Sequence, residues 1–423
     1  MRSFPKQAPR SAYLHIPFCH RRCFYCDFVV EPLGDGAHGE EGRGNKSIKS
    51  YLEILKREIA SVSRSLPLST IYIGGGTPSL LSPLQIKSLL DHLKGHFGFQ
   101  DGFELTLEVD PASFDKASLY GYLEAGVNRI SLGGQSFDDS ILLQLGRNHT
   151  RKDLIQACAW LNDALNQGDL SSWSLDLIQN LPGHNLLNWK SQLHQAIDSS
   201  APHLSIYDLS IEPGTVFASK FEKGLLDIPK EDLASEISLM SSVILSNYGF
   251  SRYEISNYAL PGHASRHNRV YWSGVGWWGF GQGATSCPWG ERFSRPRTID
   301  RYKKWVELQE KGEIQESLLQ DNFKIIDFDE QLLVGLRRRE GVDIEQLAIT
   351  WGWNKKQREY YLSLLISAWE DSINSGLLIK CGMRFYLNNP QGMELSNRVL
   401  IEMFYWWENL PVDLGVQSIL SEH

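Results

Sequence analysis

The sequence predicts an α/β fold, a partial barrel of about six βα units followed by a smaller α+β module of winged-helix character. Three observations support this. Strand-like and helix-like segments alternate over the first 255 residues, glycines, aromatics and histidines interrupt the alternation at Gly262–Pro296, and helix signals dominate from about Thr298. Alternation of this kind implies a parallel sheet with right-handed crossovers, and six units are fewer than the eight of a closed barrel. We therefore expect an open barrel in residues 1–297 and a second domain in residues 298–423.

Each expected strand is a short apolar run rich in β-branched or aromatic residues, and each expected helix has apolar residues at helical spacing. The strands are expected at Tyr13–Ile16, Thr70–Ile73, Phe103–Val109, Arg129–Leu132, Ser174–Ile178 and Leu204–Leu209, with an extended segment at Ser251–Ile255. The barrel helices are expected at Ile48–Leu66, Pro83–Phe97, Phe114–Glu124, Asp138–Leu145, Lys152–Leu165, Leu186–Ile197 and Glu231–Ser246. The second domain is expected to contain helices Ile299–Glu310, Asp329–Arg338, Ile344–Trp351, Lys355–Asn374 and Glu394–Glu408, and a hairpin of Leu377–Lys380 and Phe385–Leu387.

Composition excludes several classes of function. The 423 residues carry 42 Lys and Arg against 50 Asp and Glu, a formal net charge of −8. Such a chain is a poor general binder of nucleic acids or anionic membranes, so we expect no nucleic-acid partner. No apolar run approaches the roughly 18 residues of a membrane span, and Met1–Arg10 lacks the apolar stretch of a secretory signal. Six cysteines are too few for a disulfide scaffold, which predicts a cytoplasmic protein.

Cys19, Cys23 and Cys26 form a C-x3-C-x2-C pattern, in which three thiolates of one loop can converge on a metal centre. Structural zinc usually takes four ligands, often as two C-x2-C pairs, and no second pair is present. A four-iron cluster normally takes four thiolates, so three leave one iron with an open position for a chelating small molecule. The spacing favours an iron–sulfur cluster, and zinc or inert thiols remain the alternatives.

The cysteine loop also carries a family resemblance. Ala12–Cys19 together with Cys23–Cys26 resembles the radical S-adenosylmethionine (SAM) superfamily, in its anaerobic coproporphyrinogen oxidase branch. The resemblance extends through Gly74–Ser79, Glu108–Pro111, Gly133–Phe137, Arg147, Asp176–Ile178, Leu181–Gly183, Ile211–Thr215 and Tyr253–Tyr258. Within that branch, His267–Trp272 resembles the H-N-x-x-Y-W signature of HemW-like haem chaperones. The resemblance as a whole implies a radical-SAM barrel with a further C-terminal domain.

The resemblance implies that Cys19, Cys23 and Cys26 hold a [4Fe-4S] cluster whose fourth iron is chelated by SAM. One electron from the reduced cluster then cleaves the sulfonium to a 5′-deoxyadenosyl radical. The residues implied to bind the cofactor are Tyr13, Tyr25, Gly75, Gly76, Thr77, Glu108, Gln135, Arg147 and Asp176. Several of these side chains follow the carboxyl ends of expected strands, the face on which α/β barrels place their sites.

A second chemistry is expected in Gly262–Cys287, which contains His263, His267 and five aromatic residues between glycines. Imidazole is a common axial ligand of haem iron, and aromatic rings can cover a flat macrocycle. Composition alone favours core tryptophans and a structurally hydrogen-bonded His267. The resemblance favours haem, with His267 as its first-choice ligand. Cys287 could bond covalently to a haem vinyl, but the C-x-x-C-H motif is absent, so a buried free thiol is expected.

The sequence departs from the oxidase at Phe28, which stands where the oxidase has a further cysteine, and the chaperones share this feature. Gly134 replaces the usual Val, and Gln179-Asn180 replaces the usual Tyr-Gly. The predicted function is a HemW-like haem chaperone that delivers haem to acceptor proteins. It implies an electron donor such as a flavodoxin or ferredoxin, and a possible peripheral membrane association through the acceptor. The alternatives are an oxygen-independent coproporphyrinogen III oxidase and a protein that only cleaves SAM.

Overall fold

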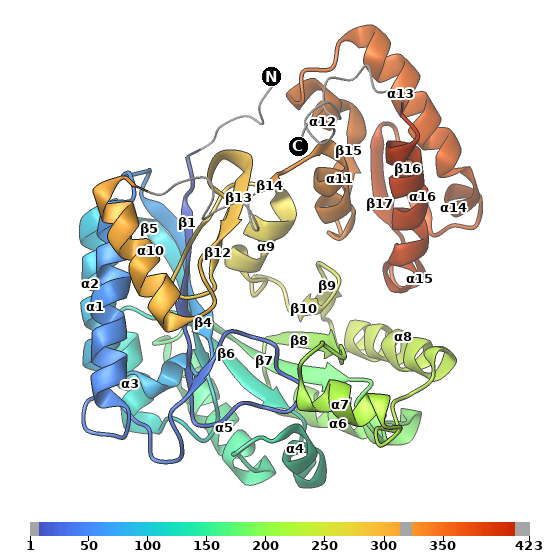
Figure 1. Ribbon diagram of the computed structural model, residues 1–423. Coiled ribbons are helices and arrows are strands. Elements are labelled where there is room, and N and C mark those ends of the chain that lie inside the picture. Colours follow the sequence, from blue (N-terminus) through green and yellow to red (C-terminus); the bar gives the residue numbers. More distant parts are fainter. Residues whose placement is uncertain (1–7, 314–323, 411–423) are drawn as a thin grey trace.

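The computed structural model describes residues 8–313 and 324–410, and Figure 1 shows a barrel-like α/β part and a smaller C-terminal part. One sheet of nine strands forms the barrel part, in the order β11-β1-β4-β5-β6-β7-β8-β10-β9. Six neighbouring strands are parallel, as expected: β1 (Ser11–Ile16), β4 (Leu68–Gly75), β5 (Phe99–Val109), β6 (Arg129–Gln135), β7 (Ser172–Gln179) and β8 (His203–Asp208). The two ends of this sheet, β11 and β9, do not pair with each other, so the predicted open barrel is confirmed.

The sheet is longer at both edges than the sequence predicts. β11 (Trp278–Phe280) adds to β1 in parallel, while β10 (Asn257–Ala259) and β9 (Ser251–Arg252) extend β8 with antiparallel strands. β11 was not expected because it lies within the glycine-rich segment. Its central residue, Gly279, is required there, since a Cβ at this position would lie 2.1 Å from the carbonyl oxygen of Thr285. A short parallel pair, β2 (Phe18–Cys19) and β3 (Glu31–Pro32), holds the two ends of the cysteine loop together.

Helices surround this sheet (Figure 1). They are α1 (Asn45–Ser61), α2 (Pro83–Phe97), α3 (Lys116–Glu124), α4 (Asp139–Leu145), α5 (Arg151–Gln167), α6 (Leu186–Asp198), α7 (Val216–Glu222), α8 (Glu231–Asn247), α9 (Arg266–Ser273) and α10 (Ile299–Lys311), with short 3-10 turns at Pro78–Leu80 and Pro288–Gly290. Local sequence sets many of their ends. Ser82 begins α2 through a reciprocal capping box with Gln85, and Gly168 ends α5 in the left-handed conformation. Helices α7 and α9 were not expected.

The C-terminal part has an α+β composition, as predicted. Its sheet has the antiparallel order β15-β17-β16, formed by β15 (Val342–Asp343), β17 (Arg384–Leu387) and β16 (Leu378–Cys381). Its helices are α11 (Phe328–Leu336), α12 (Ile344–Thr350), α13 (Lys355–Ala368), α14 (Glu370–Asn374), α15 (Gln391–Glu394) and α16 (Ser396–Glu408). The single helix expected over residues 355–374 is therefore two helices. A linking sheet of β12 (Thr285–Ser286), β13 (Glu291–Ser294) and β14 (Lys324–Ile325) joins the two parts.

Two hydrophobic cores correspond to these two parts. The first contains buried residues from Ala12 to Val306, and the second contains buried residues from Phe328 to Leu410. Helix α10 belongs to the first core and packs on α1. The division of the chain at residue 298 stays a prediction.

A buried ion pair fastens the glycine-rich segment to the barrel. Arg295 donates to Glu58 of α1 at 2.7 Å, and both side chains are 0% exposed. Glu58 also accepts from the Gly281 N–H at 2.8 Å and from the Tyr302 hydroxyl at 2.6 Å. These contacts bring α1, the residues that directly follow β11 and β13, and α10 to one charged group. Among the described residues no helix has the length and apolar character needed to cross a bilayer.

Candidate functional site

A cavity of about 410 Å³ lies at the carboxyl ends of β4–β8, against the cysteine loop; we call it the main cavity. Eleven of the thirteen predicted site residues line it: Cys19, Cys23, Tyr25, Cys26, Gly75, Gly76, Thr77, Glu108, Gln135, Arg147 and Asp176. The other two, Tyr13 and His267, lie outside its lining. The strand ends therefore bring most of the predicted residues together, although they are spread over more than 150 positions of sequence.

The three cysteines are free thiols at the edge of the main cavity. Burial raises the pKa of Cys19 to about 12, although Thr77 and Arg147 act to lower it, and burial also raises the pKa of Cys26. A thiolate here needs further positive charge, which a bound metal centre supplies. In the described parts of the chain, no three His, Cys, Asp or Glu side chains converge on a point that suits a single metal ion. This holds for Cys19, Cys23 and Cys26 as well, so the choice between zinc and an iron–sulfur cluster stays a prediction.

The glycine turn after β4 seats the cysteine loop against the barrel. A Cβ on Gly76 would lie 2.6 Å from the Phe18 carbonyl oxygen and 2.8 Å from Cys19 Sγ, so only glycine fits. The N–H of Gly76 donates to Ile16 at 2.8 Å and that of Thr77 to Phe18 at 2.7 Å. The N–H groups of these two residues, which the resemblance assigns to cofactor binding, thus hold the turn.

Two half-buried carboxyl groups lie on the barrel wall of the main cavity. Glu108 accepts from the Gly75 N–H at 2.9 Å and from the Tyr72 hydroxyl at 2.8 Å, and burial raises its pKa to about 7. Asp176 accepts from Ser131 at 2.8 Å, and burial raises its pKa as well. A cationic or hydroxyl-bearing ligand would stabilise the ionised form of these carboxyl groups. Their raised pKa values therefore indicate candidate positions for such a ligand.

Arg147 has a carboxylate partner within the protein. Its Nη2 pairs with Asp110 and donates to the Gly133 carbonyl at 3.0 Å, while Nη1 lies 3.6 Å from Cys23 Sγ. Burial opposes ionisation of Asp110, but Arg147 and His149 hold its pKa well below the usual range. Asp110 and His149 were not singled out as site residues, and the position of Asp110, two residues after Glu108, was the available signal.

Two residues that line the main cavity have buried polar atoms without a hydrogen-bond partner. Within the described residues, neither Gln135 Oε1 nor Arg147 Nε has a hydrogen bond although both atoms are buried. Gln135 also adopts a left-handed backbone conformation, with φ of 57° at the end of β6. Buried polar groups are nearly always satisfied, and strained positions cluster at functional sites. The residues present therefore fit a polar ligand at this point.

The charge of the main cavity favours a cation. Its lining contains six carboxylates (Asp27, Glu108, Asp110, Asp176, Asp208 and Glu212) and three guanidinium groups (Arg21, Arg22 and Arg147). Clefts lined by one sign of charge concentrate ligands of the opposite sign. The lining therefore suits a positively charged small molecule better than one bearing several carboxylates.

His267 lies in the interior, outside the lining of the main cavity but stacked on Tyr72, which belongs to that lining. Its ring is 0% exposed, with Nδ1 2.9 Å from the Thr70 hydroxyl and Nε2 2.9 Å from the Tyr271 hydroxyl. Burial lowers its pKa to about 3, so the imidazole is neutral. Both ring nitrogens are engaged here, which is the hydrogen-bonded arrangement that composition alone predicts. A ligand role for His267 stays a prediction and requires one of these bonds to be exchanged for iron.

A second cavity, of about 310 Å³, lies beside the main cavity and shares Asp27 and Phe28 with it. Its other lining residues are Tyr13, His15, Val29, Tyr271, Trp277, Gly283, Ala284, Thr285 and Arg297. The Tyr13 hydroxyl lies 3.0 Å from His15 Nδ1, and Tyr271 packs edge-on against Trp277 with ring centroids 5.0 Å apart. The expected aromatic segment and the cysteine loop therefore meet at this second cavity.

Comparison with known proteins agrees with this geometry. The radical SAM superfamily pattern matches residues 13–188. The chain is 36% identical to "Heme chaperone HemW" of Synechocystis sp. over 94% of this chain and 96% of that protein, and 32% identical to the Lactococcus lactis protein of the same name over 93% and 97%. The solved structure of coproporphyrinogen III oxidase (HemN) from Escherichia coli, described as a radical SAM enzyme, matches with a TM-score of 0.75 and 19% identity, covering 95% of this chain and 96% of that one.

Proposed function

The chain belongs to the HemW haem chaperone family of the radical SAM superfamily, and we propose on this premise that it binds haem and delivers it to acceptor proteins. The proposal includes a [4Fe-4S] cluster on Cys19, Cys23 and Cys26, with SAM bound beside it in the main cavity. A cytoplasmic location, a flavodoxin or ferredoxin as electron donor, and membrane contact only through the acceptor complete the proposal.

The observation that carries the cofactor proposal is the set of unpartnered polar atoms beside the three thiols. Gln135 Oε1 and Arg147 Nε are buried in the same cavity that the cysteines line. SAM carries a sulfonium, an ammonium and one carboxylate, so its net positive charge matches the acidic lining. When bound, the cluster and SAM supply one-electron cleavage of the sulfonium. Gln135, Asp176 and Glu108 would hold SAM, and Arg147 keeps Asp110 ionised next to Cys23.

The residue at position 28 disfavours the alternative function, coproporphyrinogen III oxidase. Phe28, at the position of the oxidase's further cysteine, is 58% exposed between the two cavities. An exposed aromatic ring at a cavity edge suits contact with a flat apolar ligand. These features support a haem carrier rather than a decarboxylase.

For haem, we propose His267 as an axial ligand and the rings of the second cavity as neighbours of the macrocycle. Binding iron through Nε2 would replace the hydrogen bond to Tyr271, and Tyr271 and Trp277 line the second cavity. Haem titration of the wild type and His267→Ala, followed by optical spectra, tests this assignment. Unchanged affinity and an unchanged Soret band in the variant would remove His267 from the ligand role.

Anaerobic reconstitution tests the cofactor proposal. We expect about four iron and four sulfide per chain, and an EPR signal that changes on addition of SAM. Cys26→Ser should lose most of the iron and sulfide, whereas Cys381→Ser, at an exposed cysteine remote from the cavity lining, should retain them. Stoichiometric zinc without sulfide would refute the cluster. Formation of vinyl porphyrinogen in an anaerobic assay would favour the oxidase.

A further inference from the structure

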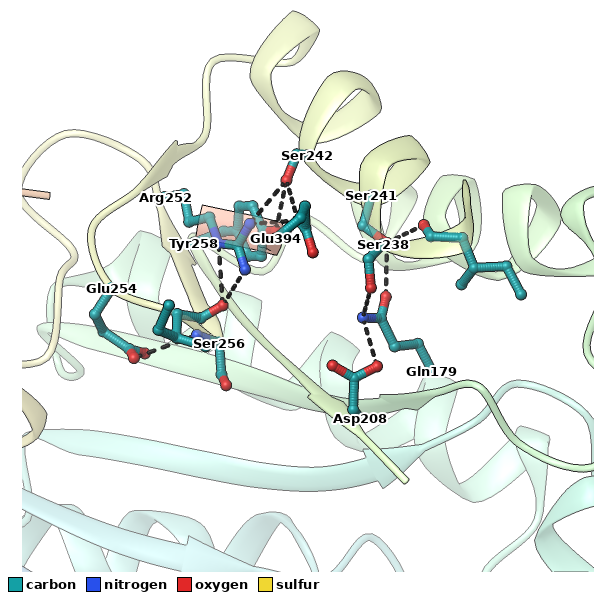
Figure 2. Close-up of polar contacts among 12 residues, drawn as sticks. Gln179, Asp208, Ser238, Ser241, Ser242, Arg252, Glu254, Ser256, Tyr258 and Glu394 are labelled. Carbon is teal, nitrogen blue, oxygen red and sulfur yellow. Dashed lines mark hydrogen bonds and ion pairs between the residues drawn. The ribbon is translucent and has the colours of Figure 1, made fainter. Parts of the chain in front are cut away.

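Helix α8 has a buried serine face. Ser238, Ser241 and Ser242 are three and four positions apart, which places them on one side of the helix, and all three are buried. Buried hydroxyls need hydrogen-bond partners, and serine is otherwise a weak choice for a helix interior. The partners of these three hydroxyls lie in two different parts of the molecule (Figure 2).

One side of this face holds the end of β7. Gln179, the last residue of β7, donates to Ser238 at 2.7 Å and accepts from Ser241 at 2.9 Å (Figure 2). The amide of Gln179 also donates to Asp208 at 3.0 Å, and these two residues pair across β7 and β8. Ile178 and Asp208 both line the main cavity. The serines of α8 therefore hold the end of β7, which forms this section of the cavity wall, in place.

The other side of this face holds the C-terminal part. Ser242 Oγ lies 3.0 Å from the Tyr258 hydroxyl, 3.2 Å from Arg252 Nη1 and 3.2 Å from Glu394 Oε1. Arg252 forms an ion pair with Glu394, the last residue of α15, and its guanidinium lies 5.4 Å from the Tyr258 ring centroid. In Figure 2, Glu394 faces Arg252 and Ser242, and this group lies beside the group around Gln179. The ion pair is largely buried, so solvent screens it little.

We propose that α8 links the docking of the C-terminal part to the wall of the main cavity, so that loss of the Arg252–Glu394 contact lowers the affinity of that cavity for its ligand. Ser241 and Ser242 are adjacent, hence a shift of α8 that follows one network disturbs the other. By thermodynamic reciprocity, ligand binding also strengthens the docking of α15. This inference rests on the proposed SAM site, and Gln179 and Glu394 act in it as positioning residues.

The test compares three full-length variants with the wild type, each first checked for a native circular dichroism spectrum. Glu394→Ala removes the contact at α15, and Ser241→Ala cuts the link at the barrel side. Glu340→Ala is the matched control, because Glu340 pairs with Arg269 of α9 across the same two parts without touching α8. Hydrogen exchange is measured without ligand in peptides covering residues 176–182 and 391–394, and the SAM dissociation constant is measured on the reconstituted protein.

Glu394→Ala should speed exchange in both peptides and weaken SAM binding about five-fold or more, the lower range of coupling between sites. Ser241→Ala should speed hydrogen exchange in residues 176–182 but not in residues 391–394. Glu340→Ala should leave the exchange rate of residues 176–182 equal to that of the wild type. The link is refuted if Glu394→Ala loosens only residues 391–394 and binds SAM as Glu340→Ala does. If the wild type binds no SAM, the proposed function fails, and exchange at residues 176–182 alone decides the link.

Discussion

Glu58→Ala should destabilise the barrel more than any substitution at its surface. Glu58 accepts three hydrogen bonds, from Arg295, Gly281 and Tyr302, and it is 0% exposed. Its removal leaves the guanidinium of Arg295 buried among Phe280, Phe293 and Trp305, where the Ser286 hydroxyl is its one remaining hydrogen-bond partner among the described residues. Removing one partner of a buried ion pair costs about 3–5 kcal/mol, a large share of the roughly 5–15 kcal/mol that stabilises a typical protein.

Urea unfolding followed by circular dichroism, with a thermal scan alongside, measures this cost. The matched control is Arg57→Ala, on the same helix, whose ion pair with Glu310 of α10 has side chains 43% and 34% exposed. That exposed pair should contribute about 1 kcal/mol or less. The double variant Glu58→Leu/Arg295→Met should regain much of the lost stability, because no charge stays buried. A loss below about 1 kcal/mol for Glu58→Ala would contradict the reasoning.

Three further predictions concern the main cavity. Gly76→Ala should greatly reduce iron and sulfide incorporation, because its Cβ would collide with Phe18 and Cys19, whereas Gly95→Ala in α2, with open space around it, should incorporate both normally. Burial raises the pKa of Glu108 from 4.5 to about 7, so the folded state binds a proton more tightly than the unfolded state. Stability relative to Glu108→Gln should then fall as pH rises from 4.5 to 7, and urea titrations that show a rise would contradict this. Asp110→Asn leaves Arg147 without its carboxylate and should weaken SAM binding by about ten-fold or more, since buried charge pairs are strongly coupled; equal affinity in calorimetry would show that Arg147 is held by other contacts.

Short-range features of the sequence were sufficient for the barrel and for most of the site. Alternating apolar runs predicted the six parallel strands, because periodicity is a property of consecutive residues. Residues such as Glu108 and Asp176 follow apolar strand residues directly, and parallel strands end at one edge. Their convergence on the main cavity with the cysteine loop could therefore be expected without knowing any distance.

The pairing of residues far apart in sequence was decided only by the tertiary structure. Glu58 and Arg295 are separated by 237 positions, and Arg252 and Glu394 by 142. Strand β11 exists because β1 offers it an open edge, which no pattern within Trp278–Phe280 reveals. The resemblance assigns Arg147 to SAM and His267 to haem iron, and both assignments stay predictions. Only the tertiary structure shows that Arg147 pairs with Asp110 and that both ring nitrogens of His267 lie beside hydroxyl groups. The sequence by itself thus determined the six parallel strands, the thiol loop and the face that carries the site, whereas the edge strands and the partners of each buried side chain depend on which distant groups lie around them.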